Sequence, residues 1–517
     1  MGARVVMKTL GGAVRPERLI LLVMMALPLL CRASANWPDD PEARLDALRA
    51  SAIAGNGHVR AAWAGLLEAE AGALGVAGYF DTVVATSAGV ADWSRNVPGA
   101  TSPYAIGSDR AVLQAGVEQP LQPGIFLAAG VSSSFLRQGD LHARDANRTL
   151  AGVQVRVPLL QNRGHAQWRW EQAAAEAGME MRRARLRAVI EDMRLASDRT
   201  YIALLHAVAD AAAFQRAAAR VASLLEGTEA LVRLQAVPAY QLFPSRADAA
   251  LRADETVAAE QLVQALRQQL ATLLDGGEAV PATAEDLPQW AAQRLPWVLA
   301  MPATPGEEMA HGSLRALSAQ RDEAQALLRA ADDAARPDVQ IVLQTSWESG
   351  DETRLAEGWR DAGMDDVGYE AALVWRSPLQ RRQERAARAA ARARVAAVEA
   401  QIAQQALSLT ALRAEATGNL KAAARRMALV GEALDNARST LEAEAERFRL
   451  GEGRSRDVLD AQKDLTTAEL RRNATAAALL LAYADWSYAA GYPEGLVPGE
   501  APSKKLSLLL ATLEEGD

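Results

Sequence analysis

The sequence predicts a mainly α-helical fold built from two copies of one unit, in which short strands precede a long helical hairpin. One observation is that 447–461 lies between two long helical stretches, while 233–247 occupies the same place 214 residues earlier, both segments beginning with arginine and ending with alanine. The other is that alternating strands precede each helical stretch and end in a Pro-Leu step, at 158–159 and at 378–379. A repeat of about 200 residues is too long for a solenoid unit, so it indicates a duplicated half-molecule.

The composition favours long helices over a thick globular core. Alanine, leucine, glutamate, glutamine and arginine dominate the long stretches, and all of them are good helix formers. Aromatic residues make up only 5% of the chain, which is low for a large compact core. The formal net charge of −8 disfavours a nucleic-acid partner.

The first 35 residues have the pattern of a signal peptide. Basic residues precede an apolar run from Leu19 to Leu30, and Ala33-Ser-Ala35 offers a cleavage site. The run is shorter than the ~20 residues of a membrane-spanning helix, which favours cleavage after Ala35 over an uncleaved anchor. Cys31, the only cysteine, then leaves with the signal, unless it is itself a lipidation site. We therefore expect no disulfide and no cysteine metal ligand in the mature protein.

The rest of the chain divides at changes of composition. We expect, in order, a first repeat at 36–275, a Pro- and Gly-rich connector at 276–312, a second repeat at 313–492 and a tail at 493–517.

The strands of the first half carry a membrane-like pattern. Valines at 153, 155 and 157 alternate with Gln154 and Arg156, as expected for a strand with one apolar face. The spacers between the strands run long, short, long, which is typical of outer-membrane barrels. No later apolar run reaches ~18 residues, so entry into a membrane would be as a β-barrel. The four candidate strands are 81–91, 110–119, 124–136 and 149–158.

The helices are unusually long. One of about 70 residues would extend ~105 Å at 1.5 Å per residue, which no compact globular fold requires. The expected helices are 41–76 (in one or two pieces), 163–234, 245–274, 313–335, 382–449 and 456–490, with the second set of strands at 339–347 and 367–376.

Three motifs carry a family resemblance. They are Val155-Arg-Val-Pro-Leu-Leu160, Leu373-Val-Trp-Arg-Ser-Pro-Leu379 and the helix reversal Phe448-Arg-Leu-Gly-Glu-Gly-Arg-Ser-Arg-Asp-Val-Leu-Asp-Ala461. With these motifs and this order of elements, the chain resembles the TolC-type outer membrane efflux proteins over about 41–490. The resemblance implies a homotrimer in which the strands form one barrel in the outer membrane and the helices form an α-barrel through the periplasm. It also implies a passive exit duct of a tripartite efflux or type I secretion system, partnered by a periplasmic adaptor, an inner-membrane transporter and outer-membrane lipid.

The same resemblance assigns roles at the helix reversals. Asp457 and Asp460 match the aspartates that ring the periplasmic entrance, where three copies of each carboxylate would attract cations and repel one another. Both could instead be helix-start acids favoured by the helix dipole, and the two readings are compatible. The adaptor would dock at the reversals, on Arg447, Leu450, Gly451 and Val237. The first reversal departs from the family pattern, because Val237-Pro-Ala stands where glycine is usual.

Several alternatives stay open at this point. The family pattern has two strands in each half, so 110–136 either adds a hairpin to the barrel or forms an appendage. A periplasmic coiled-coil structural or adaptor protein is the main rival to a duct, and a periplasmic enzyme is a weaker one. We expect no catalytic site, cofactor or metal, since the five histidines are scattered and no catalytic motif is present. The exported substrate cannot be read from the sequence.

Overall fold

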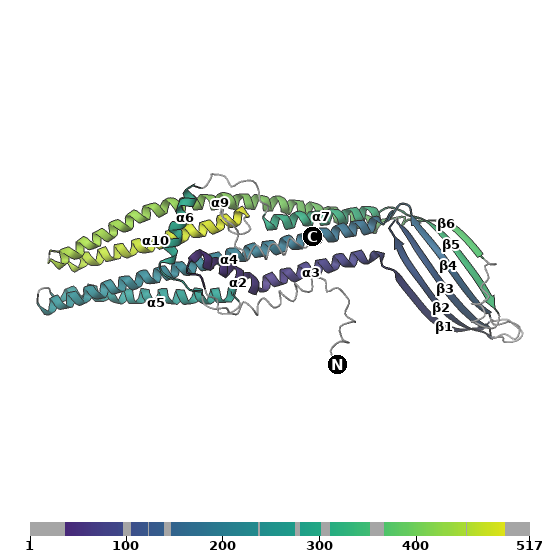
Figure 1. Ribbon diagram of the computed structural model, residues 1–517, viewed down its shortest axis with the longest axis horizontal. Helices are drawn as coiled ribbons and strands as arrows, with labels where there is room; N and C mark the ends of the chain where they lie inside the picture. The colour runs from purple at the N-terminus through teal and green to yellow at the C-terminus, as the bar shows by residue number, and fades with distance from the viewer. Residues whose placement is uncertain are drawn as a thin grey trace, which may run out of the picture. The chain divides into compact units, whose positions relative to one another are not determined.

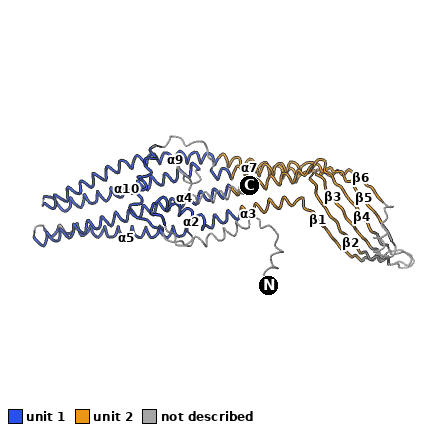
Figure 2. Tube along the Cα trace, viewed as in Figure 1, with its two compact units in different colours: residues 1–64, 184–315, 404–517 blue, residues 65–183, 316–403 orange. Residues whose placement is uncertain are grey.

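The computed structural model describes residues 37–96, 105–122, 124–138, 146–235, 238–274, 280–300, 311–351, 367–450 and 452–491. The predicted signal and tail, and the candidate docking residues Val237 and Gly451, lie outside these ranges. The chain divides into two compact units (Figure 2). The first comprises 1–64, 184–315 and 404–517, and the second comprises 65–183 and 316–403.

The elements follow the predicted order in both halves (Figure 1). The first half contains α2 (Pro41–Gly55), α3 (Gly57–Ala77), β1 (Val83–Asn96), β2 (Ala105–Leu121), β3 (Ile125–Gln138), β4 (Ala146–Pro158), α4 (Ala166–Arg233) and α5 (Leu242–Leu273). Next come α6 (Asp286–Ala300), α7 (Gly312–Ala334), β5 (Asp338–Asp351), β6 (Val367–Arg376), α9 (Arg382–Arg449) and α10 (Ser455–Ala490). Short 3-10 turns at Gly78–Phe80 and Ala239–Gln241 precede β1 and α5.

The two long helices confirm the duplication, because α4 and α9 each contain 68 residues. The helix after the first reversal begins earlier than expected. It starts at Leu242, and Pro244 lies within its first turn, where the missing N–H would have no helical partner anyway. The connector contains one helix of 15 residues, α6. In the part of the chain that the structure describes, no helix has both the length and the apolar character needed to cross a membrane.

All six strands belong to one antiparallel sheet in the second unit (Figure 1). Their spatial order is their chain order, from β1 to β6, and continuous pairing joins every neighbouring pair. The β2–β3 hairpin lies inside this sheet, between β1 and β4. The hairpin reading of 110–136 is therefore confirmed, and the appendage reading is wrong.

The main hydrophobic core belongs to the first unit and is assembled from both halves of the chain. Leu48 of α2, Leu204 of α4, Leu287 of α6 and Leu480 of α10 are all fully buried in it. Three aromatic rings complete the core, since Trp297 contacts Tyr483 and Trp486 edge-on, with centroids 5.5 Å apart in both pairs. Alanines fill much of the remaining contact surface, so helices pack closely despite the low aromatic content.

Candidate functional site

The sheet has one apolar face that is open to its surroundings. The pairing register places even-numbered residues of β1 and odd-numbered residues of β2 to β6 on this face. Large side chains on it are strongly exposed, including Val90 at 88%, Tyr369 at 84% and Leu373 at 69%. An extended exposed apolar surface of this kind marks a protein or membrane contact. Other members of the face are Val84, Leu113, Val117, Val131, Val153, Val155, Ile341, Leu343 and Trp375.

The opposite face of the sheet is polar. Arg156 of β4 forms an ion pair with Glu118 of β2 at 2.8 Å, across the intervening strand. Gln154, Gln344 and Glu370 lie in one line of paired positions across β4, β5 and β6. Along each strand, apolar side chains on one face therefore alternate with polar side chains on the other. This alternation is typical of strands that separate lipid from a water-filled interior.

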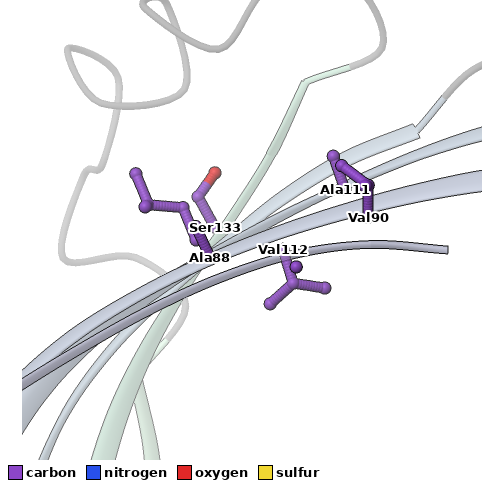
Figure 3. A pocket seen from close by; sticks show the side chains of 7 residues that line it. Ala88, Val90, Ala111, Val112 and Ser133 are labelled. Carbon is purple, nitrogen blue, oxygen red and sulfur yellow. The ribbon is translucent and has the colours of Figure 1, made fainter.

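A depression on the sheet offers no small-molecule site. It measures about 460 Å³ and is lined by Ala88, Gly89, Val90, Ala111, Val112, Leu113 and Ser133. Its lining residues come from both faces, and Figure 3 shows Val112 on the other side of the strands from Ser133. Because no polar groups converge there, the geometry gives no basis for specific ligand binding.

The second helix reversal, in the first unit, is a tight turn between α9 and α10. The N–H groups of Glu452 and Gly453 both donate to the Arg447 carbonyl, at 2.9 and 3.1 Å. A Cβ on Gly453 would lie 3.0 Å from the Phe448 nitrogen, so the turn favours glycine at this position. Leu450 is 63% exposed at the apex of this turn.

The two candidate entrance aspartates lie on the exposed side of α10. Val458, Ala461 and Leu465 are buried, whereas Asp457 and Asp460 are exposed. The Asp457 carboxylate accepts a hydrogen bond from the Arg454 N–H at 3.3 Å, so it also caps the first turn of α10. The geometry supports a helix-start role for Asp457, and its exposure is compatible with the predicted entrance role, which stays a prediction.

Arginines around this reversal pair with nearby acids on the same helix. Arg447 donates to Glu444 at 2.9 Å, and the Arg456–Asp460 pair is at 4.0 Å with both side chains exposed. Exposed pairs of this kind contribute about 0–1 kcal/mol to stability. Such weakly held charges remain available to a partner surface.

The first reversal has a different chemistry, because it is apolar rather than acidic. Leu234, Tyr240 and Phe243 are 76%, 65% and 68% exposed around it. Its nearby ion pair, Arg246–Glu229 at 3.0 Å, is partly exposed as well. The departure from the family pattern seen in the sequence therefore corresponds to a distinct surface, and this exposed apolar set is a feature that the sequence reasoning missed.

A histidine that the sequence reasoning treated as one of five scattered residues anchors the β2–β3 hairpin. The His165 ring is 1% exposed, and its Nε2 donates to the Leu121 carbonyl at 2.7 Å while Nδ1 lies 3.1 Å from the Tyr79 hydroxyl. Rings of Tyr79, Phe80 and Phe126 contact it edge-on, with centroids 5.1–5.3 Å away. The hairpin turn is therefore fastened to the start of α4.

The buried ionisable groups of the first unit form structural pairs. Burial raises the pKa of Asp286, but hydrogen bonds from Arg44 and Thr283 outweigh burial and hold this pKa below its ordinary value. Burial also raises the pKa of Glu191 and lowers that of His311, whose Nε2 lies 3.6 Å from the Glu191 carboxylate. Among the described residues, no three His, Cys, Asp or Glu side chains are grouped to hold a metal ion.

Comparisons with known proteins show the fold and give a family match through part of the chain. Residues 310–491 match the family model described as outer membrane efflux protein. The outer-membrane channel OprN is 17% identical with a TM-score of 0.62, covering 88% of this chain and 90% of its own. Campylobacter jejuni CmeC, also an outer membrane channel, is 13% identical with a TM-score of 0.62, covering 90% of this chain and 88% of its own.

The outer membrane protein VceC from Vibrio cholerae is 14% identical, with a TM-score of 0.62, and the match covers 87% of this chain and 96% of VceC. Among curated protein sequences, none matches significantly. The structural likenesses show a shared fold over both halves, and the family match confirms the predicted resemblance through the second half.

Proposed function

We propose that this chain, a member of the outer membrane efflux protein family through residues 310–491, is the passive exit duct of a tripartite export system. Three copies would form the channel, and a periplasmic adaptor and an inner-membrane transporter would deliver the substrate. The observation that carries the proposal is the two-faced sheet on the fold shared with outer-membrane channels. Energy enters at the transporter, so the duct itself needs no catalytic cycle and no cofactor.

The sheet suits an outer-membrane location. A tilted strand crosses the hydrocarbon core of a bilayer with 9–11 residues, and the six strands contain between 10 and 17. Exposed valine, leucine and isoleucine side chains on one face would contact lipid, while the glutamines and charged groups of the other face would line the interior. In a wholly periplasmic coiled-coil protein, this exposed apolar face would be in contact with water rather than lipid.

A pair of adjacent substitutions in β2 tests which face contacts lipid. Leu113→Arg puts a charge on the apolar face and is expected to cost about 2–4 kcal/mol per chain if it lies near the bilayer midplane. Gln114→Arg puts the same charge on the polar face of the same strand and should be tolerated. The measurement is the amount of each variant recovered from outer membranes after carbonate extraction. Equal recovery of the two variants would contradict the assignment of faces.

The exposed aspartates of α10 suit a gated entrance. In a trimer, Asp457 and Asp460 would each be present three times around the periplasmic end of the duct. Like charges around a narrow opening repel one another and attract cations. Their exposure leaves them free for this role, and the bond from Arg454 to Asp457 fixes one of them on the first turn of the helix.

Removing these charges should change the electrical behaviour of the duct. Asp457→Asn with Asp460→Asn keeps an oxygen that can cap the helix but removes the carboxylate charges. We expect the double variant to show a higher leak conductance or a weaker block by divalent cations in planar bilayers. Asp435→Asn, at a 79% exposed position on α9, is the matched control. Conductance and block like those of the unmodified protein would remove the entrance role.

Docking of the adaptor is proposed at the two reversals. Arg447 and Leu450 are exposed at the α9–α10 turn, next to Gly451 in the chain. The exposed Leu234, Tyr240 and Phe243 flank Val237 at the α4–α5 turn. Aromatic and arginine side chains are the residue types that most often dominate binding energy at protein interfaces. One partner could therefore use a charged contact at one reversal and an apolar contact at the other.

The function as a whole is tested by deletion and complementation. Cells that lack the gene should accumulate the exported substrate of its partner transporter, and the intact chain should restore export. The variant with Asp457→Asn and Asp460→Asn is expected to restore it with altered leak. A protein that is released from membranes by carbonate, and whose loss changes no export, would favour the periplasmic coiled-coil reading instead.

A further inference from the structure

We propose that the two turns at which the sheet passes into the long helices form a binding surface for anionic phospholipid headgroups of the periplasmic leaflet. The surface, which we call the junction rim, consists of exposed leucines and arginines from both turns: Leu160, Arg163, Arg169, Leu379, Arg382 and Arg385. All of them belong to the second unit, together with the sheet. This lipid contact depends on the outer-membrane location but not on what the duct carries.

The two turns repeat one sequence pattern. Leu-Gln-x-Arg occupies 160–163 after β4 and 379–382 after β6. In both turns the residue before the arginine has a left-handed backbone conformation, with φ +55° at Asn162 and φ +46° at Arg381. The two halves therefore share both the sequence pattern and the backbone shape of this turn, and each presents a leucine followed by an arginine.

The two turns lie close together at one end of the sheet. Pro158 at the end of β4 pairs with Gln340 of β5, which pairs with Val374 near the end of β6. The two outer strands of this set are separated by two strand spacings of about 4.8 Å, so the turns are roughly 10 Å apart. Both α4 and α9 leave the sheet at this end (Figure 1). Side chains from both halves can therefore contribute to one surface.

The junction rim carries positive charge that the described residues leave unpaired. Its four arginines are exposed, and none of them forms an ion pair with a described residue. The acids of α7 and β5 have other arginine partners, in the pairs Asp332–Arg388, Asp333–Arg336 and Asp338–Arg376. Glu171 and Glu384, in the first two turns of α4 and α9, offset only part of the charge. The rim is thus net positive in a chain whose formal net charge is −8.

Exposed apolar side chains accompany these arginines. Leu379 is 100% exposed and Leu160 is 46% exposed, while Trp375 at the end of the apolar face of β6 is 67% exposed. Contact with water alone would be unfavourable for such side chains, whereas the boundary between acyl chains and headgroups accommodates apolar and basic residues together. Tryptophan is typical of this boundary. The combination fits a lipid surface better than a water-filled interior.

The arginines are spaced to reach the headgroup layer. This layer is about 5–7 Å thick in each leaflet, and Arg382 and Arg385 lie about 4.5 Å apart along α9, at 1.5 Å per residue. The long stem of an arginine lets its charged end extend toward the polar layer. A guanidinium group binds phosphate oxygens with two parallel N–H bonds. An anionic lipid should gain about fivefold in affinity for each arginine near the membrane surface.

Lipid titration of the purified full-length protein in detergent, followed by native mass spectrometry, tests the junction rim. The probes are phosphatidylglycerol, which is anionic, and phosphatidylcholine with the same acyl chains, which has no net charge. The test variant is Arg382→Gln with Arg385→Gln. The matched control is Arg425→Gln with Arg426→Gln, which removes two exposed arginines roughly twelve turns farther along the same helix.

We expect the unmodified protein and the control to bind phosphatidylglycerol more tightly than phosphatidylcholine. The test variant should bind phosphatidylglycerol about 25-fold more weakly, which is fivefold for each lost arginine, and phosphatidylcholine as before. Arg382→Lys with Arg385→Lys keeps both charges and should keep most of the preference. Leu379→Ser should weaken the binding of both lipids, because it removes an apolar contact rather than a charge.

Three results would overturn the lipid surface. Equal binding of the two lipids by unmodified, threefold particles would remove it and leave the duct intact. A test variant that keeps the full preference for phosphatidylglycerol would show that these arginines do not recognise the headgroup. Loss of the preference together with loss of threefold particles would assign the arginines to a contact between copies instead. Release of the unmodified protein from membranes by carbonate would overturn the outer-membrane location, and the lipid surface with it.

Discussion

Arg44→Ala is expected to destabilise the helical unit by about 3–5 kcal/mol, the cost of removing one partner from a buried ion pair. The Arg44 guanidinium contacts both carboxylate oxygens of Asp286, at 2.7 and 3.2 Å, and the two side chains are only 5% and 7% exposed. It also donates to the carbonyl groups of Pro38 and Pro281 at 2.8 and 3.1 Å. One side chain thus joins α2 to the start of α6, and its loss leaves Asp286 charged, buried and without its main partner.

The pH dependence of this effect has a definite sign. In the unmodified protein the pKa of Asp286 is held below its ordinary value, so the pair contributes fully above the unfolded pKa of about 3.9 and is lost as pH falls through the folded pKa. In the Arg44→Ala protein the hydrogen bonds and the charge of Arg44 are gone, so the pKa of Asp286 rises above its value in the unmodified protein. The stability deficit of the variant should therefore shrink as pH falls from 7 toward 4, measured by thermal denaturation in detergent.

Two further variants make the Arg44 result specific. Arg44→Met with Asp286→Leu removes both charges and should recover most of the lost stability, because no unpaired buried charge remains. Arg321→Ala breaks an exposed pair with Asp322, in which the side chains are 40% and 54% exposed, and should change stability by less than about 1 kcal/mol. A deficit for Arg44→Ala no larger than that of Arg321→Ala would contradict the structural role of the buried pair.

Gly124→Ala is expected to prevent correct assembly of the sheet, at a cost of about 3 kcal/mol or more, combining backbone strain with a displaced turn. Gly124 has φ +89°, a conformation that side chains strongly disfavour, and its added Cβ would meet the Gly164 backbone. Moving the turn away would break the bond from His165 to Leu121. The measurement is the amount of folded protein in outer membranes, together with its melting temperature in detergent.

Gly89→Ala is the matched control for this prediction. Gly89 lies in β1 of the same sheet, and a Cβ added there would meet nothing within 4 Å. It should assemble and melt like the unmodified protein. Normal assembly of the Gly124→Ala protein would show that the hairpin turn has room to move away from α4, and the hairpin would then lose its fixed place in the barrel.

The alternating and helical patterns predicted most of the fold because they are local. Valines at 153, 155 and 157 specify an apolar strand face, and the helix at Arg382–Arg449 has the predicted bounds. Strand lengths were underestimated where the apolar pattern stops before the pairing does, since β2 reaches from Ala105 to Leu121. The sequence did not decide whether the β2–β3 hairpin joins the sheet. Pairing of β1 with β2 and of β3 with β4 depends on contacts between strands, and a single sequence does not specify these contacts.

The candidate site at the second helix reversal was predictable only where a local motif marks it. The motif around Asp457 identified an exposed turn, and the structure adds that this aspartate also caps α10. Contacts between residues far apart in the sequence could not be predicted. Arg44 and Asp286 are 242 residues apart in the chain, and His165 meets Leu121 across 44 residues. A single buried histidine or arginine carries no pattern that reveals its partner, so only the folded chain shows which polar residues hold the helices and the hairpin in place.

Electron microscopy of the protein extracted from outer membranes in mild detergent tests whether three chains form one duct. We expect threefold particles in which a membrane-embedded barrel continues into a helical tube, with helices of 68 residues extending roughly 100 Å at 1.5 Å per residue. A map at sufficient detail should resolve six strands from each chain in the barrel. Monomers or dimers without a closed barrel would contradict the duct.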